Sequence, residues 1–171
     1  RDILLQLRLN AFVVIRRKLL DLVKKLSFAH SLEASSATLQ SRVIEIKDKL
    51  VGYGEEILNR NKGEVFRQFI SLMIARLPVD TKRGHATELS ASKGAYLHSS
   101  ELLSDLKILK KELIKFGAQS TAYNEVNATL RIVETFGFHL AALDIRQNST
   151  FHDQAMDELL EASLADKSNF S

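Results

Sequence analysis

The sequence predicts a mainly α-helical segment, a helical bundle with one possible short strand. One Pro and seven Gly occur in 171 residues, and Leu, Ala, Lys and Glu are abundant, which is typical of long helices. Apolar residues recur at spacings of three and four along most of the chain, the pattern of a helix with one buried face. The 45% hydrophobic composition suffices for a core of ordinary size.

The first expected helix covers residues 3–28. Its apolar stripe consists of Leu4, Leu7, Ala11, Val14, Ile15, Leu19, Leu22, Val23 and Leu26. Its other face carries Arg8, Arg16, Arg17, Lys18, Lys24 and Lys25. A solvated surface is the usual role of such a face, although a basic face can also meet an anionic partner.

A Ser-rich stretch at residues 31–41 precedes a second helical pattern that runs from Leu39 to Leu58. Gly52 and Gly54 should interrupt that helix, because each Gly costs about 1 kcal/mol relative to Ala in a helix interior. A third helix is expected at residues 64–77 and is closed by the sole proline, Pro78.

Residues 78–98 lose this periodicity and predict a long, polar, mobile loop. Ser99 or Ser100 can then cap a helix that ends at Gly117. Another helix is expected at about residues 124–135.

The period changes at residues 136–147, FGFHLAALDIRQ, which fit a short buried strand or a continuing helix. His139 within this apolar run is expected to be a core residue. Arg146 is suited to a phosphorylated or carboxylated substrate because its planar fork grips two oxygens, but Asp144 and Arg146 fit a structural ion pair equally well. A last helix, to about residue 162, should bury Met156, Leu159 and Leu160.

Composition and motifs exclude several classes of protein. The charge, 24 Lys and Arg against 21 Asp and Glu, favours no polyanionic partner such as nucleic acid. The absence of Cys rules out disulfides and thiolate chemistry, and no apolar run is long enough to span a membrane. Phosphate-loop, dinucleotide, zinc-protease and serine-hydrolase signatures are missing, and the spacing of the histidines suggests no metal site.

The segment TFGFHLAALDIRQNS at residues 135–149 closely resembles the motif T-F-G, apolar strand, D-I-R-Q-x-S of phosphoenolpyruvate carboxylases. EVFRQFISLMIARL and HSSELLSDLKILKKELIKFG are similar to the helix-loop-helix region that precedes this motif in the family. The chain starts at Arg1 and stops just beyond a helical pattern, so we expect an internal segment, 1–171, of a larger enzyme.

The resemblance implies an α/β barrel rich in helices, with residues 136–147 as a barrel-strand motif. It implies a cytoplasmic homotetramer that carboxylates phosphoenolpyruvate with bicarbonate, using Mg²⁺ or Mn²⁺, to give oxaloacetate and phosphate. Arg146 then binds substrate and takes part in catalysis, with Gln147 as a second substrate-binding residue.

This sequence departs from the family by carrying Asn148 where many members have Glu. The family's metal-binding carboxylates, other substrate-binding arginines and mobile glycine-rich loop are absent from the segment, so the metal should bind outside it and the segment alone should be inactive. The alternative is a helical scaffold whose basic first helix and long loop bind a protein or anionic partner.

Overall fold

The computed structural model describes residues 2–82, 85–90, 92–140 and 149–167. The chain divides into two units, Arg1–Ala141 and Ala142–Ser171. In its described part, the second unit consists of helix α8 (Ser149–Lys167). The first unit holds the hydrophobic core.

Helices dominate the first unit, which confirms the predicted fold class. They are α1 (Asp2–Lys25), α2 (Ala37–Lys49), α3 (Gly54–Arg60), α4 (Val65–Ala75), α5 (Ser99–Phe116), α6 (Gln119–Thr121), the π-helix η1 (Ala122–Val126) and α7 (Asn127–Phe136). The last three follow one another without a break, so the helix expected at residues 124–135 begins earlier and contains a π-helical turn.

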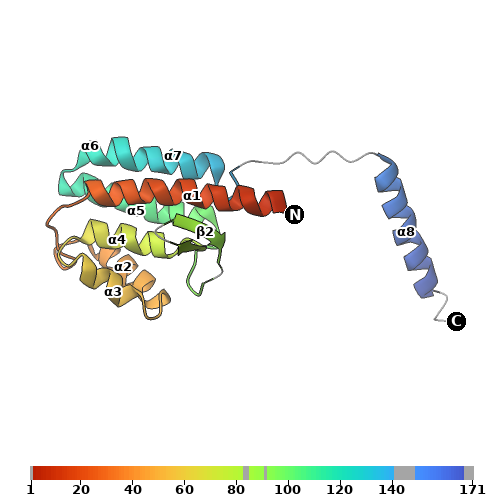
Figure 1. The fold of residues 1–171 in the computed structure, drawn as a ribbon, viewed down its shortest axis with the longest axis horizontal. Helices are drawn as coiled ribbons and strands as arrows, with labels where there is room; N and C mark the ends of the chain where they lie inside the picture. Colours follow the sequence, from red (N-terminus) through yellow and green to blue (C-terminus); the bar gives the residue numbers. More distant parts are fainter. Residues whose placement is uncertain (1, 83–84, 91, 141–148, 168–171) are drawn as a thin grey trace. The chain divides into compact units, whose positions relative to one another are not determined.

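The core lies between α1, α4, α5 and α7. Helix α1 packs against α4 on one side and α7 on the other, while α5 packs against α2, α4 and α7 (Figure 1). Phe12, Leu19, Phe69, Leu106 and Val126 are fully buried. The apolar stripe of α1 is buried only from Ala11 onward; Leu4 and Val14, expected inside, are 51% and 37% exposed.

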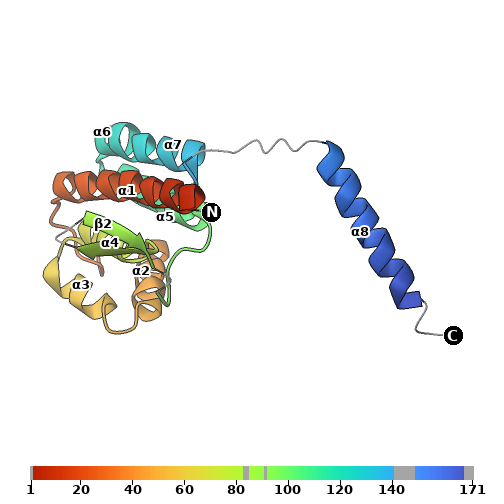
Figure 2. The same ribbon diagram turned by 45° about the vertical axis from the view of Figure 1, so that its right-hand side comes forward.

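The loop predicted at residues 78–98 contains a β-hairpin, which corrects the prediction. Strands β1 (Val79–Lys82) and β2 (His85–Leu89) pair antiparallel, with a bulge between Asp80 and Thr81. Strand β2 lies along α1 in both views (Figures 1 and 2). These strands are short and mostly exposed, so the alternation of a half-buried strand is absent from their sequence.

Glycines mark the helix boundaries as expected. Helix α2 ends before the Gly52-Tyr53-Gly54 triplet and α3 begins at Gly54. Gly117, with φ 95°, caps α5 in the left-handed conformation. The N-cap of α5 is His98, not Ser99 or Ser100, and the Glu101 carboxylate accepts hydrogen bonds from the backbone N–H groups of Leu97 and His98 at 3.0 and 3.2 Å.

At the C-terminal side, Phe136 belongs to α7 and residues 137–140 form a turn and bend. The strand predicted for residues 136–147 therefore does not include residues 136–140, and residues 141–147 lie outside the described residues. Helix α8 forms where a last helix was expected, but Met156, Leu159 and Leu160 are 59%, 67% and 53% exposed instead of buried. None of the described helices combines the length and hydropathy needed to cross a membrane.

Candidate functional site

Arg146 and Gln147, the predicted substrate-binding residues, lie outside the described part of the chain, as does Asp144. The structure places the residues on either side of them. Helix α8 begins at Ser149, and Phe138 is the last described residue before the D-I-R-Q motif whose side chain is buried. The described part of the first unit ends just after α7, at Leu140.

Phe138 packs against α1 at this end of the first unit. Its ring centroid lies 4.7 Å from that of Phe12, with the rings tilted by 51°. Gly137 and Leu140 have positive φ angles of 53° and 65°, which residues other than Gly rarely adopt. The Leu140 N–H donates to the Phe136 carbonyl at 3.0 Å. Packing and a tight turn therefore hold residues 136–140 against the first unit.

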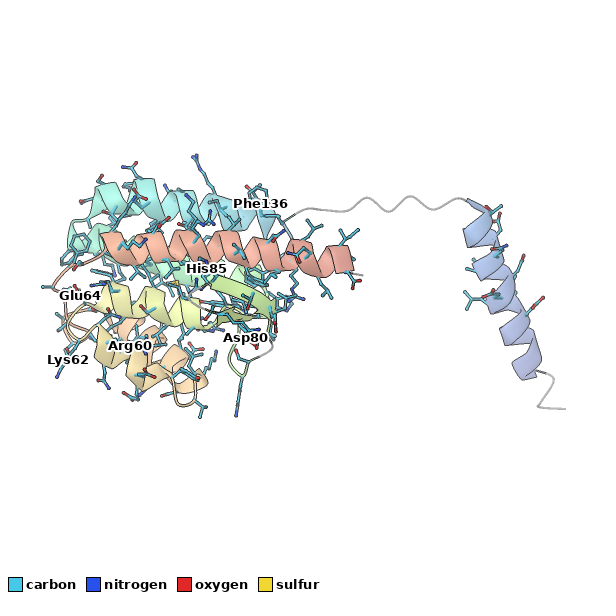
Figure 3. All side chains as sticks on the ribbon, in the orientation of Figure 1. Arg60, Lys62, Glu64, Asp80, His85 and Phe136 are labelled. Atoms are coloured by element: carbon cyan, nitrogen blue, oxygen red, sulfur yellow. The ribbon has the colours of Figure 1, made fainter. Side chains whose placement is uncertain are left out.

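His139 is exposed within this turn, so the prediction that it is a core residue is wrong. The physical reason is that the backbone turns after Phe136 instead of continuing as a buried strand. Figure 3 shows Phe136 at the same end of the first unit as Asp80 of the hairpin, whereas Lys62 and Glu64 lie at the opposite end.

A buried ionic cluster is the most polar part of the core. The Asp105 carboxylate of α5 accepts hydrogen bonds from Arg42 Nε at 2.6 Å, from the Tyr96 hydroxyl at 2.7 Å and from Arg76 Nη1 at 3.4 Å. Asp105, Tyr96 and Arg76 are at most 2% exposed. Together with Glu101, these residues are referred to below as the Asp105 cluster.

The guanidinium of Arg76 has several partners inside the fold. Its Nε donates to the Gly94 carbonyl at 2.9 Å, its Nη2 to Glu101 at 2.8 Å, and its guanidinium carbon lies 3.9 Å from the centre of the Tyr96 ring. A buried arginine with its donors used inside the fold is suited to joining elements, here α4, α5 and the segment that carries Tyr96. The Asp105 cluster is therefore structural and offers no open cation to a substrate.

The protonation states of the Asp105 cluster follow from burial and from these contacts. Burial, together with the charge and the hydrogen bond of Asp105, raises the pKa of Tyr96 well above its ordinary value, so the phenol stays protonated and donates. Burial works to raise the pKa of Glu101, but hydrogen bonds from backbone N–H groups and from Arg76 outweigh it and lower that pKa.

Among the described residues, no group of three or more His, Asp or Glu side chains is placed to hold a metal ion.

Comparison with known proteins indicates the family of this chain, which the geometry alone does not. The family model of phosphoenolpyruvate carboxylase matches residues 1–170. This chain belongs to the phosphoenolpyruvate carboxylase family. A phosphoenolpyruvate carboxylase of Rhodopseudomonas palustris strain BisA53 is 29% identical over 93% of this chain and 19% of its own length. Those of Bradyrhizobium diazoefficiens and Roseiflexus castenholzii are 38% and 33% identical over 59% and 63% of this chain, and over 11% and 12% of their own lengths.

The chain thus spans about a fifth of the length of a curated phosphoenolpyruvate carboxylase, at most 19% among these three. The resemblance of residues 135–149 to the D-I-R-Q motif lies inside the matched region. The chain accordingly matches a segment of the phosphoenolpyruvate carboxylases to which it is similar.

The scaffold alternative rested on the basic face of α1, and part of that face is neutralised within the fold. Lys25 Nζ lies 2.6 Å from the Glu125 carboxylate, and Lys24 Nζ lies 3.6 Å from Asp21. The Asp105 cluster was not predicted from the sequence, although one signal for it was present: Asp105 stands on the apolar face of α5 beside Leu102, Leu106 and Leu109.

Proposed function

We propose that this segment supplies Arg146 as a substrate-binding and catalytic residue of a phosphoenolpyruvate carboxylase, a carbon–carbon lyase that joins phosphoenolpyruvate to bicarbonate. The observation that supports this proposal is the family match over residues 1–170, which includes Asp144-Ile145-Arg146-Gln147. The products are oxaloacetate and inorganic phosphate.

In the proposed reaction, the bond between the phosphorus and the enol oxygen of phosphoenolpyruvate breaks as a bicarbonate oxygen bonds to the phosphorus. Carboxyphosphate and the enolate of pyruvate result. The enolate carbon then attacks the carboxyl carbon, forming the carbon–carbon bond, and phosphate leaves. Negative charge builds on the phosphoryl oxygens and on the enolate oxygen, so a fixed cation stabilises the transition state.

Arg146 is proposed to donate two parallel hydrogen bonds to the phosphoryl oxygens, which a guanidinium does at any working pH. The Gln147 amide is proposed as a neutral donor beside it.

The proposal includes the setting of the enzyme. Mg²⁺ or Mn²⁺ would be held by residues outside this segment and would supply positive charge that stabilises the developing negative charge. The parent enzyme is a homotetramer in the cytoplasm with phosphoenolpyruvate and bicarbonate as substrates. The isolated segment is inactive, because the remaining binding groups belong to other parts of the enzyme.

Oxaloacetate formation by the full-length enzyme tests the role of Arg146. With phosphoenolpyruvate, bicarbonate and Mg²⁺, we expect Arg146→Ala to lower kcat/KM by about 10²- to 10³-fold, because a fixed donor at developing charge is lost. Arg146→Lys should recover only part of this loss, since an ammonium keeps the charge but lacks the fork.

Arg60→Ala is the matched control. Arg60 is an exposed arginine whose side chain is 71% accessible and pairs with Glu56 on α3, so the same substitution there should leave kcat/KM unchanged. Full activity in Arg146→Ala would refute the assigned residue, and a wild-type enzyme that forms no oxaloacetate would refute the proposed reaction.

A further inference from the structure

A groove between α5 and α7 has four cations among its eight lining residues. It has a volume of about 430 Å³, within the range of small-molecule sites. Its lining consists of Lys107, Lys110, Lys111 and Ile114 from α5 and of Asn127, Leu130, Arg131 and Glu134 from α7. These residues define the α5–α7 groove, which is separate in sequence from the D-I-R-Q motif.

Helical spacing explains how the two rows come to face one groove. On α5, the lining residues follow Lys107 at intervals of three, four and seven, and on α7 they follow Asn127 at the same intervals. Residues at these spacings lie on one side of a helix. Because α5 and α7 pack against each other, each helix presents one polar row along the line of contact.

The cations of the α5–α7 groove differ from several other lysines of the first unit, which are paired with carboxylates. Lys25, Lys47 and Lys115 lie 2.6, 2.9 and 2.8 Å from a carboxylate oxygen. Among the described residues, no carboxylate lies within 4.0 Å of the charged nitrogens of Lys107, Lys110, Lys111 or Arg131. Lys107 and Lys111 also stand four residues apart, a like-charge spacing that destabilises a helix.

The π-helical turn shapes one end of this surface. Tyr123 of η1 lies beside α5, with the Lys110 Nζ 5.2 Å from the centre of its ring. An aromatic face at this distance attracts the ammonium and restrains Lys110 next to the groove. π-helical turns of this kind are frequent at functional sites.

We propose that the α5–α7 groove binds a small phosphorylated anion with at least two negative charges. Four cations and one carboxylate, Glu134, give the lining a net charge of +3. The fork of Arg131 suits two phosphoryl oxygens and the lysines neutralise the remaining charge. Leu130, 6% exposed, and Ile114 supply an apolar contact for the body of the ligand.

Isothermal titration of the full-length protein with inorganic pyrophosphate tests this site. We expect saturable binding that Lys110→Ala/Arg131→Ala weakens by at least about tenfold, the effect of losing charge-assisted hydrogen bonds. Arg131→Lys should weaken binding less, since the charge remains. Titrating each variant in an Arg146→Ala background separates this binding from binding at the proposed active site.

Arg60→Ala/Lys62→Ala is the matched control, because it removes one Arg and one Lys from the end of the first unit opposite Phe136 (Figure 3). The control should bind pyrophosphate as the wild type does. Equal weakening in the control, or unchanged affinity in Lys110→Ala/Arg131→Ala, would overturn the site. Citrate binding as tight as that of pyrophosphate would overturn the phosphoryl assignment. A change of oligomeric state without a change in pyrophosphate affinity would mark the groove as a protein interface and likewise overturn the proposal.

Discussion

Asp105 shows at the scale of single residues how this fold tolerates charge in its core. Its side chain is fully buried, and an isolated carboxylate there would be strongly unfavourable. Two arginines and one phenol satisfy its two oxygens. Removing one member of such a buried set lowers the free energy of unfolding by more than the whole set contributes to it, because the remaining charges are left buried without a partner.

We therefore expect Asp105→Asn to lower the free energy of unfolding by about 3–5 kcal/mol. Tyr96→Phe, which removes one neutral donor from the same carboxylate, should cost about 1–3 kcal/mol. Urea denaturation of the chain measures both. Glu88→Gln on β2 breaks an exposed pair with Lys82 and should change stability little; equal losses in Asp105→Asn and Glu88→Gln would contradict a structural role for the cluster.

The sequence could reveal Asp105 as an exception on an apolar face, but it could not reveal its partners. Arg42 lies 63 residues away and Arg76 lies 29 residues away. Each is one of many basic residues, and the choice between them depends on how α2, α4 and α5 pack. Local periodicity carries no information on that choice, so the Asp105 cluster required the structure. Arg146, in contrast, is proposed as a site residue from the sequence motif alone, and its role remains a prediction.

At the scale of elements, glycine and apolar spacing predicted most helices because both act locally. The Gly52-Tyr53-Gly54 triplet separates α2 from α3 and Gly117 ends α5, as expected. The β-hairpin was missed because its exposed strands have no apolar alternation and are positioned by packing against α1. The exposure of Leu159 in α8 was missed because periodicity identifies an apolar face but not what covers it.

Gly54 allows α2 and α3 to approach closely. A Cβ at this position would lie 2.4 Å from the Lys47 backbone carbonyl oxygen, so Gly54→Ala should force the two helices apart and lower the free energy of unfolding by about 1–3 kcal/mol. Gly63→Asn is the control, because Gly63 has φ 82° and open space around it and Asn tolerates that conformation. Thermal unfolding of both variants decides the point; an unchanged Tm in Gly54→Ala would contradict the close approach.

For the whole molecule, the paired carboxylates predict loss of stability in acid. Hydrogen bonds from Lys49 and Arg42 lower the pKa of Glu45 from 4.5 to about 2, and the pKa values of Glu64, Glu101 and Glu112 are also lowered. Because these pKa values are lower in the folded state, the unfolded chain binds more protons in acid. The stabilisation is complete above pH 4.5 and is lost as the pH falls towards about 2.

Urea denaturation at a series of pH values measures this loss. We expect the free energy of unfolding to fall steadily below pH 4.5, and Glu45→Gln to reduce the fall because one linked carboxyl is removed. A free energy of unfolding that stays constant across this range would contradict the proposed linkage.

Phe12 lies near the start of the first unit and Phe138 near its end, and their rings are in contact in the core. The chain between these two residues therefore forms a closed loop. The β-hairpin lies inside that loop, with strand β1 mostly exposed. A hairpin that gains or loses residues in the course of evolution would change the length of the chain between the two rings, but not the point at which the chain leaves the unit. Such a closure separates the exposed β-hairpin from residues 136–140 at the end of the described part of the first unit.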